Sequence, residues 1–149
     1  MKKKNSTSDF SASRSRAMLE NFRSAIAAQS KIEIKKAFQT VAEAPAPRFW
    51  VSEFRAAAVI GKMLSGNDPT PDMLPEKREM YRELYSRVLV LREANPDRSI
   101  YDLVFEAVNQ PAPRNYMSPK RVMTIVYEEQ KRLRRERLLK TDERRGGHE

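Results

Sequence analysis

Two copies of a proline-rich block constrain the fold of this chain more than any other sequence feature. Pro45-Ala46-Pro47-Arg48 recurs as Pro111-Ala112-Pro113-Arg114 at an offset of 66 residues. The residues that follow the blocks, up to Arg55 and Arg121, and the apolar positions before them keep the same register without a gap. Because proline ends helices and stiffens its surroundings, the pattern predicts a duplicated unit of helix, helix, linker and helix.

Each half of the chain predicts three helices. In the second half, residues 75–94 begin with proline at a first helical position and place apolar residues at spacings of three and four. Ser99 and Ser118 are typical helix caps, and the last helix is expected to end near Leu139. In the first half, the expected helices cover 14–28, 31–43 and 53–64.

The expected fold is all-α: a small bundle of about six helices built from two repeated helix-helix-linker-helix units. No stretch alternates apolar and polar residues between turn signals, as a strand does. Phe54 and Ile60 are core candidates, and Gly66 is a candidate for the left-handed residue that ends a helix. The expected organisation is a disordered basic N-terminal arm over 1–13, a first helical repeat over 14–66, a proline-rich linker over 67–74, a second helical repeat over 75–130, and a basic C-terminal helix extension with a disordered end over 131–149.

Several residue types needed for catalysis or metal binding are scarce. The chain contains no cysteine, which excludes disulfides and thiolate metal sites. Its single histidine, His148, is the penultimate residue, and its four glycines form no phosphate-binding loop. Asp68 and Asp72 lie in the linker, where such residues are typical turn formers. We therefore expect no enzyme, no cofactor and no metal site.

Apolar runs and the N-terminal segment indicate where in the cell the protein is expected. No apolar run approaches the length of a membrane span, and no apolar stretch follows the N-terminal lysines as it does in a secretory signal. The expected location is the cytoplasm, with the nucleoid or a virion also open, and no membrane partner is expected.

Positive charge is concentrated at the two ends. Residues 1–16 hold five basic residues and one acidic residue, and residues 131–145 hold eight basic and three acidic residues. Residues 17–130 are nearly balanced, with sixteen basic and fifteen acidic residues. Basic arms on a neutral body favour binding to phosphates, although solvated helix ends would carry the same charges. The leading hypothesis is a sequence-tolerant nucleic-acid-binding protein, with DNA favoured over RNA.

The C-terminal run supplies most of the candidate phosphate contacts, since its basic residues exceed what is needed to cap a helix. A standard helix-turn-helix is disfavoured because residues 110–118 make too long a connection between its helices. A variant in which the helix after Ser118 reads bases stays open. The candidate contacts are Lys131, Arg132, Arg134, Arg135, Arg137, Lys140, Arg121, Lys120, Arg114 and Arg48.

The proline blocks have two interpretations. As rigid elbows, they break one helix and deliver the following aromatic residue, Trp50 or Tyr116, into the core. Alternatively, they hold Arg48 and Arg114 outward as contacts for phosphates or a partner. The elbows also support a second function, a protein–protein adaptor or phage assembly protein whose interface contains exposed tyrosines and Trp50. A homo-oligomer or a phage structural partner would fit that function.

The repeated blocks Pro45–Ser52 and Pro111–Ser118 resemble those of a set of small basic helical proteins encoded by gut-bacterial chromosomes, mobile elements and phages. The resemblance covers residues 40–128. Those proteins carry an aromatic residue after the arginine in both blocks, whereas Asn115 stands in the second block here. The resemblance implies a bacterial or phage context and transfers no functional residue.

Overall fold

The protein is an all-α structure. The computed structural model describes residues 6–146. No strand occurs in that range, so the predicted fold class is confirmed. The elements are α1 (Ser6–Ala27), α2 (Ile34–Glu43), α3 (Glu53–Leu64), the 3₁₀ turn η1 (Thr70–Asp72), α4 (Pro75–Ala94), α5 (Ile100–Val108) and α6 (Pro119–Gly146).

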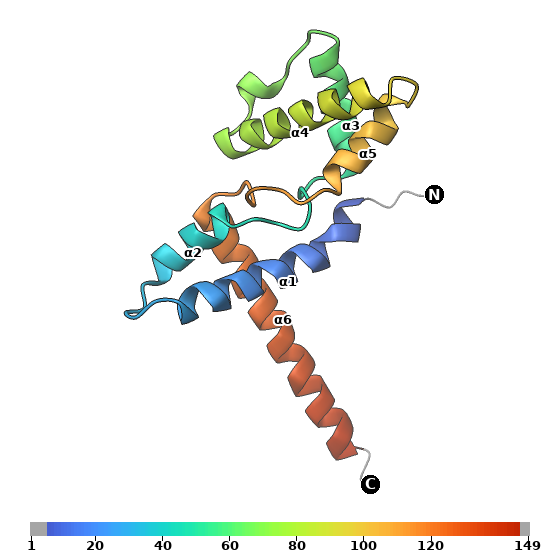
Figure 1. Ribbon diagram of the computed structural model, residues 1–149. Helices are drawn as coiled ribbons and strands as arrows, with labels where there is room; N and C mark the ends of the chain where they lie inside the picture. The colour runs from blue at the N-terminus through green and yellow to red at the C-terminus, as the bar shows by residue number, and fades with distance from the viewer. Residues whose placement is uncertain (1–5, 147–149) are drawn as a thin grey trace.

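The helices pack as two groups of three that do not follow chain order. Helices α1, α2 and α6 form one group, hereafter the α6 group, and α3, α4 and α5 form the other, the α3 group (Figure 1). The third helix of each half of the sequence therefore packs in the group that contains the first two helices of the other half. The chain crosses between the groups at the two proline elbows, residues 44–52 and 110–118.

The two elbows meet at equivalent positions. Ala46 and Ala112 form an isolated antiparallel bridge, in which each N–H donates to the other's carbonyl oxygen at 3.0 and 2.8 Å. These residues are 66 positions apart. Such reciprocal pairing is what a local two-fold axis between the elbows would produce. The origin of the two halves by duplication stays a prediction.

Buried apolar side chains of both groups form one continuous core. Aromatic stacking contributes in the α6 group, where the ring centroids of Phe22 and Phe38 lie 4.8 Å apart. In the α3 group, Leu84 of α4 and Leu103 of α5 have no exposed surface. Arg78 holds the linker that precedes α4 in place by donating to the carbonyl oxygens of Thr70 and Met73.

Local capping signals explain where the helices begin and end. The Ser52 and Ser118 hydroxyls accept hydrogen bonds from the backbone N–H groups of Arg55 and Arg121, both at 3.1 Å. Gly66 adopts a φ of +89°, which confirms it as the left-handed residue after α3. The predicted bounds of α3 and α4 agree with the structure.

Two predictions about the first half are wrong. Phe54 is 71% exposed rather than in the core, because α3 packs through Ala56, Val59 and Ile60. The N-terminal arm predicted over 1–13 is helical from Ser6 onward, and Phe10 is buried at 4% exposure.

The C-terminal helix is longer than predicted. The last helix continues to Gly146 instead of ending near Leu139. The N-terminal lysines and His148 lie outside the described residues.

Candidate nucleic-acid interface

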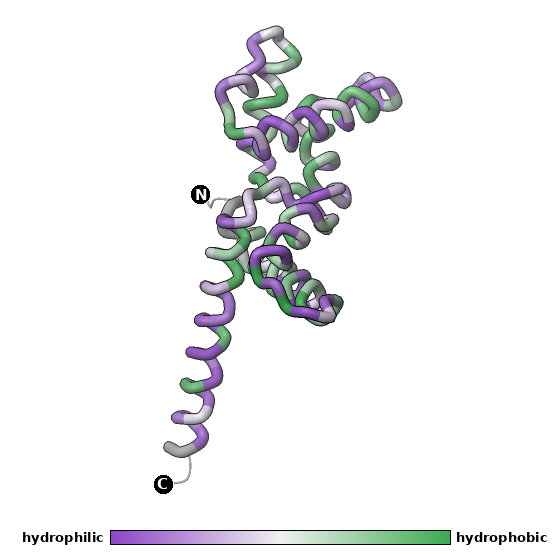
Figure 2. The backbone as a smooth tube through the Cα atoms, turned by 90° about the vertical axis from the view of Figure 1, so that its left-hand side faces the viewer, coloured by the Kyte–Doolittle hydropathy of each residue, from purple (hydrophilic) through white to green (hydrophobic). Residues whose placement is uncertain are grey.

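Helix α6 is half packed and half free. Val122, Ile125 and Val126 are buried against α1 and α2, and Leu133 is half-buried. Beyond that point the helix projects away from the rest of the protein (Figure 1), and its residues are mostly hydrophilic (Figure 2). Leu138 is 61% exposed, so the free half of α6 contributes little to the core.

The buried stripe of α6 becomes basic where the helix leaves the core. At helical spacings of three and four, this stripe passes through Val122, Val126, Glu129, Leu133, Arg137, Lys140 and Arg144. A dimer through a continuous stripe would require apolar residues along its whole length. The basic continuation instead favours contact with an anionic surface.

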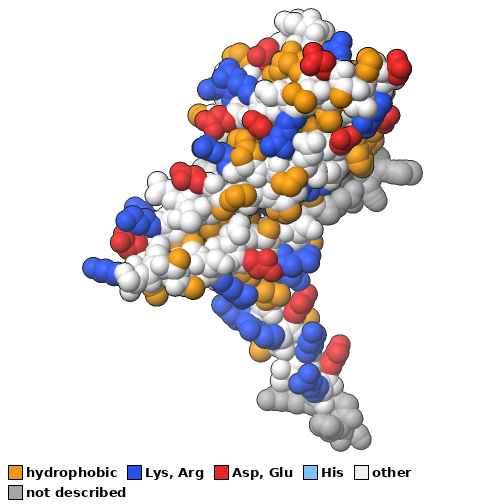
Figure 3. Space-filling view, viewed as in Figure 1, with side chains coloured by type: hydrophobic (Ala, Val, Ile, Leu, Met, Phe, Trp, Pro, Cys, Tyr) orange, Lys and Arg blue, Asp and Glu red, His pale blue; other side chains and the backbone are white. Residues whose placement is uncertain are grey.

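A groove between α1 and α6 collects arginines from both helices. Arg23 of α1 and Arg134 and Arg137 of α6 line a cavity of about 240 Å³ together with Gln130 and Leu133. No carboxylate belongs to this lining, and none of the three arginines forms an ion pair with a described residue. We call Arg23, Arg134 and Arg137 the groove arginines. Basic side chains are prominent on this part of α6 in the space-filling view (Figure 3).

Unlike the groove arginines, Arg132 has its charge neutralised by carboxylates of α6 itself. Its guanidinium donates to both carboxylate oxygens of Glu129 at 2.9 Å and also pairs with Glu136. These hydrogen bonds lower the pKa of Glu129, whose side chain is only 6% exposed. Lys131 and Arg135 share the lining of a neighbouring groove with Glu129, so this part of the predicted set is balanced by acid.

The other predicted contacts are dispersed over the protein. Lys120 and Lys140 are exposed. Arg114 pairs with Glu79 at 3.1 Å, and both side chains are about half exposed. Arg121 lines a separate cavity where the two groups meet. The structure therefore brings together only part of the predicted set.

Arg48 is turned into the elbow and is not held outward. Its side chain is 17% exposed and donates to the carbonyl oxygens of Phe49 and Val51. The guanidinium also lies over the Phe10 ring, 4.8 Å from its centroid. These contacts fit the interpretation of the first block as a rigid elbow.

The elbows bury an aromatic–amide pair. Trp50 is 9% exposed, as the elbow interpretation predicts, so it is not available for the exposed interface of the adaptor hypothesis. Its Nε1–H donates to Oδ1 of Asn115 at 2.7 Å, and Nδ2 of Asn115 donates to the Val41 carbonyl oxygen at 2.7 Å. Asn115 therefore joins the second elbow to the first and to the end of α2.

Sequence reasoning missed Arg23, which lies outside both basic termini. Its proximity to Arg134 depends on the packing of α1 against α6, which the repeated sequence does not specify. Arg14 and Arg16 of α1 were missed as individual site residues for the same reason. Arg16 lies close enough to Glu129 to affect its pKa, and it shares a groove with Arg132.

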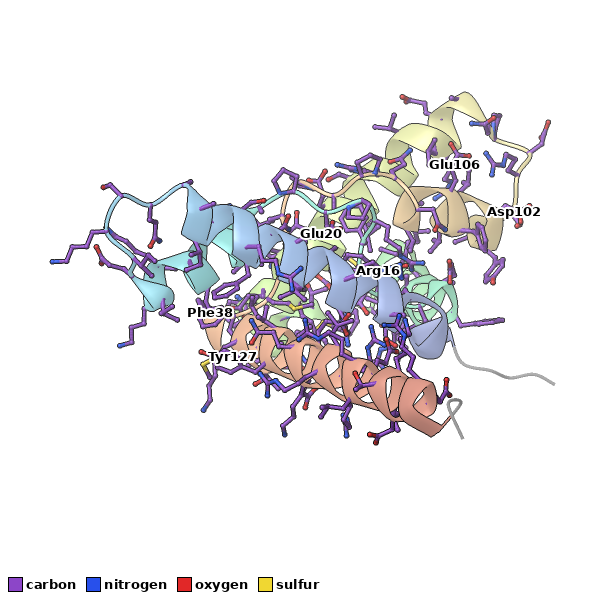
Figure 4. All side chains as sticks on the ribbon, turned by 90° about the horizontal axis from the view of Figure 1, so that it is seen from below. Arg16, Glu20, Phe38, Asp102, Glu106 and Tyr127 are labelled. Carbon is purple, nitrogen blue, oxygen red and sulfur yellow. The ribbon has the colours of Figure 1, made fainter. Side chains whose placement is uncertain are left out.

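The α3 group exposes aromatic side chains. Phe54, Tyr101 and Phe105 are 71%, 37% and 48% exposed, and the ring centroids of successive members lie 5.5 and 6.3 Å apart. We call these three residues the aromatic patch. Asp102 and Glu106, which follow Tyr101 and Phe105 in the sequence, project from α5 (Figure 4), and Glu106 pairs with Arg98 at 2.6 Å.

In the α6 group, Phe38 of α2 and Tyr127 of α6 pack edge to face with ring centroids 5.6 Å apart (Figure 4).

Comparison of the chain with protein-family models, curated proteins and solved structures found no match. None of the described helices has the length and apolar character needed to cross a membrane. Among the described side chains, no group of three or more potential metal ligands was found.

The linker carboxylate Asp68 accepts hydrogen bonds from the N–H and hydroxyl of Thr70, which lower the pKa of Asp68. These contacts are those of a residue that forms a turn.

Proposed function

We propose that this protein binds nucleic acid through phosphate contacts along the groove between α1 and α6 and the free half of α6. The observation that carries the proposal is the convergence of the groove arginines without a carboxylate among them. Exposed like charges repel one another, and a phosphate backbone would relieve that repulsion while releasing counterions.

The shape of α6 supports this function. A helix that projects from the body can lie along a phosphate backbone, and its basic stripe continues through Lys140 and Arg144. Phosphate contacts carry no base information, so binding is expected to tolerate different sequences. DNA is favoured over RNA, and the proposed setting is the cytoplasm or nucleoid of a bacterium or the virion of a phage.

The test compares two variants with the same loss of charge. One replaces the groove arginines by glutamine (Arg23→Gln, Arg134→Gln, Arg137→Gln). The control replaces three exposed residues of the α3 group (Lys62→Gln, Arg82→Gln, Arg92→Gln). Affinity for labelled duplex DNA, single-stranded DNA and duplex RNA is measured by fluorescence anisotropy at low salt.

The groove variant is expected to bind DNA about a hundredfold more weakly, from about 1 kcal/mol for each exposed arginine–phosphate contact. The control should change little. Equal losses in both variants would show that only net charge matters, and no binding by the wild-type protein would overturn the proposal.

A second candidate function is self-association through the aromatic patch. Asp102 follows Tyr101 of the patch in the sequence, and the tip of α6 in a second copy offers Leu138 and Leu139 beside basic residues, whereas Glu106 is already paired with Arg98. Apolar contact with complementary charge around it is typical of protein interfaces. This arrangement would join the α3 group of one copy to α6 of the next.

Light scattering over a concentration series tests the second candidate. Wild-type protein should associate, whereas Phe105→Ser and Leu138→Ser should each remain monomeric. A wild-type monomer at all concentrations would exclude this function. Association without DNA binding would favour it over the first proposal.

A further inference from the structure

A cavity of about 600 Å³ lies where the α3 group meets the α6 group. Its lining comes from α1, α3, α4, α6 and both elbows. This volume falls within the range of sites for small organic ligands. The cavity uses none of the groove arginines, so an inference about it does not depend on nucleic-acid binding.

The cavity spans equivalent positions of the two halves. Ser52 and Ser118 both line it, as do Arg55 and Arg121, and each pair is separated by 66 residues. The first turns of α3 and α6 therefore meet at the same cavity. First-turn amides lack acceptors within their helix, so both helix starts add positive potential to that of the arginines.

Cationic side chains dominate the charged part of the lining. Arg14, Arg55, Lys77 and Arg121 belong to it, and Glu76 is its acidic member. Among the described residues, none of these four cations forms an ion pair. Such a concentration of like charge around a cavity favours an anionic ligand.

The guanidinium of Arg14 lies over the Phe10 ring, 5.6 Å from its centroid, but one of its donor atoms is unsatisfied. Its Nε is buried and has no hydrogen-bond partner among the described atoms. Burial lowers the pKa of its guanidinium, and the nearby positive charge of Arg121 lowers it further, against the opposing effect of Glu128. A buried donor without a partner is costly, and an anion between Arg14 and Arg121 would offset both burial and repulsion.

The rest of the wall suits an organic group. Trp50 and Tyr116, at equivalent positions of the two elbows, provide aromatic rings, and Met80 and Met117 provide flexible apolar side chains. Methionine adapts to ligands of irregular shape, and aromatic rings stack on planar groups. The cavity thus combines a cationic cluster with an apolar wall.

We propose that this cavity binds a phosphate-bearing organic molecule of about mononucleotide size. Its phosphate would lie between Arg14 and Arg121, with Arg55 as a further donor, and its planar group would pack against the apolar wall. The phosphoryl group is the chemistry that the arginines recognise, and a nucleic-acid end or a free metabolite could supply it.

Trp50 makes the proposal directly measurable, because the chain's single tryptophan lines the cavity. Its fluorescence is followed during titration with uridine 5′-monophosphate, inorganic pyrophosphate, uridine and a single-stranded DNA without a terminal phosphate. Uridine monophosphate should give a saturable change with a Kd below about 1 mM, with weaker binding of pyrophosphate and none of uridine. No saturable change with uridine monophosphate would overturn the proposal.

Variants separate the cavity from general charge effects. Arg14→Gln and Arg121→Gln should each weaken uridine monophosphate binding at least about tenfold, as expected for loss of a charge-assisted hydrogen bond, whereas the control Arg92→Gln should not. In phosphate-free buffer, Arg121→Gln should leave the Tm unchanged or raise it, because it removes a like charge beside Arg14. Equal binding by all variants, or a fluorescence response to the DNA alone, would contradict the proposal.

Discussion

Helices α3 and α6 occupy equivalent places in the two halves but end differently. Helix α3 ends at Leu64, and the left-handed Gly66 turns the chain away. At an offset of 66 residues from Gly66, α6 carries Arg132 and continues to Gly146. Helix α3 ends within the packed body, whereas α6 extends beyond it as an arm with a basic surface.

The difference comes from a short stretch of sequence. Residues 65–69 contain glycine, asparagine, aspartate and proline, which favour turns, whereas residues 131–135 are lysine, leucine and arginine, which favour helix. The same change adds positive charge to the α6 group alone. Two helices in similar surroundings therefore differ in length and charge, and only α6 has the extended basic surface that the proposed phosphate contacts require.

Reversal of charge on the arm should give the largest difference between the two groups. Arg134→Glu with Arg137→Glu is expected to weaken duplex DNA binding by at least about a hundredfold, equivalent to about 3 kcal/mol. Arg82→Glu with Arg92→Glu on α4 should cost far less. Isothermal titration calorimetry at low salt measures both, and a similar loss in the two variants would remove the distinction between the groups.

The elbows provide the next largest effect. Asn115→Ala leaves the buried Trp50 Nε1–H without its acceptor and removes the hydrogen bonds that Nδ2 donates to the Val41 and Ala44 carbonyl oxygens, so the free energy of unfolding should fall by about 2–3 kcal/mol. Asn109→Ala removes exposed hydrogen bonds and should cost less than about 1 kcal/mol. Urea unfolding distinguishes the two. A small effect at Asn115 would mean that this contact does not join the groups.

Two glycines test how α3 ends. Gly66→Ala should destabilise by about 1 kcal/mol because its φ is +89°, while the added Cβ meets nothing within 4 Å. Gly61→Ala lies inside α3, also in open space, and should stabilise by about 0.5–1 kcal/mol. Thermal unfolding should therefore shift in opposite directions. A shift in the same direction would contradict the capping role of Gly66.

Acid should lower the stability of the α6 group through Glu129, and this is the smallest of the four predicted effects. Because Arg132 holds the pKa of Glu129 below its ordinary 4.5, this contribution to stability is present above that pH and declines as pH falls through the lower, folded-state value. Glu129→Gln lacks this contribution at every pH, so it should raise the pH of the acid-unfolding midpoint by about a few tenths of a unit.

The exposed Glu79–Arg114 pair supplies the matching control. Glu79→Gln should have no measurable effect on the acid-unfolding midpoint, because exposed ion pairs contribute little to stability. Identical acid profiles for wild type and Glu129→Gln would refute the role given to Arg132.

Sequence predicted the features that depend on nearby residues. Ser52 and Ser118 cap helices through contacts three residues away, and Gly66 closes α3 through its own backbone. Val122 and Val126 follow helical periodicity into the core. Each of these signals acts within one or two helical turns, which is the range over which a sequence can be read directly.

Features that depend on packing between distant helices could not be predicted. The repeated sequence does not specify which helices pack together, whereas in the structure α1 packs with α6 and brings Arg23 to Arg134. The orientation of α3 toward α5 likewise leaves Phe54 exposed, although its apolar side chain suggested a core position. The candidate interface and the cavity both arise from this exchange of third helices.

Hydrogen–deuterium exchange with and without duplex DNA tests the account most directly. Residues 134–144 of α6 are all exposed, so little burial slows the exchange of their backbone amides, and bound DNA should slow it markedly. The account predicts protection over residues 134–146 and around Arg23, with α3, α4 and α5 unchanged. Unchanged exchange over residues 134–146, or protection confined to the α3 group, would contradict it.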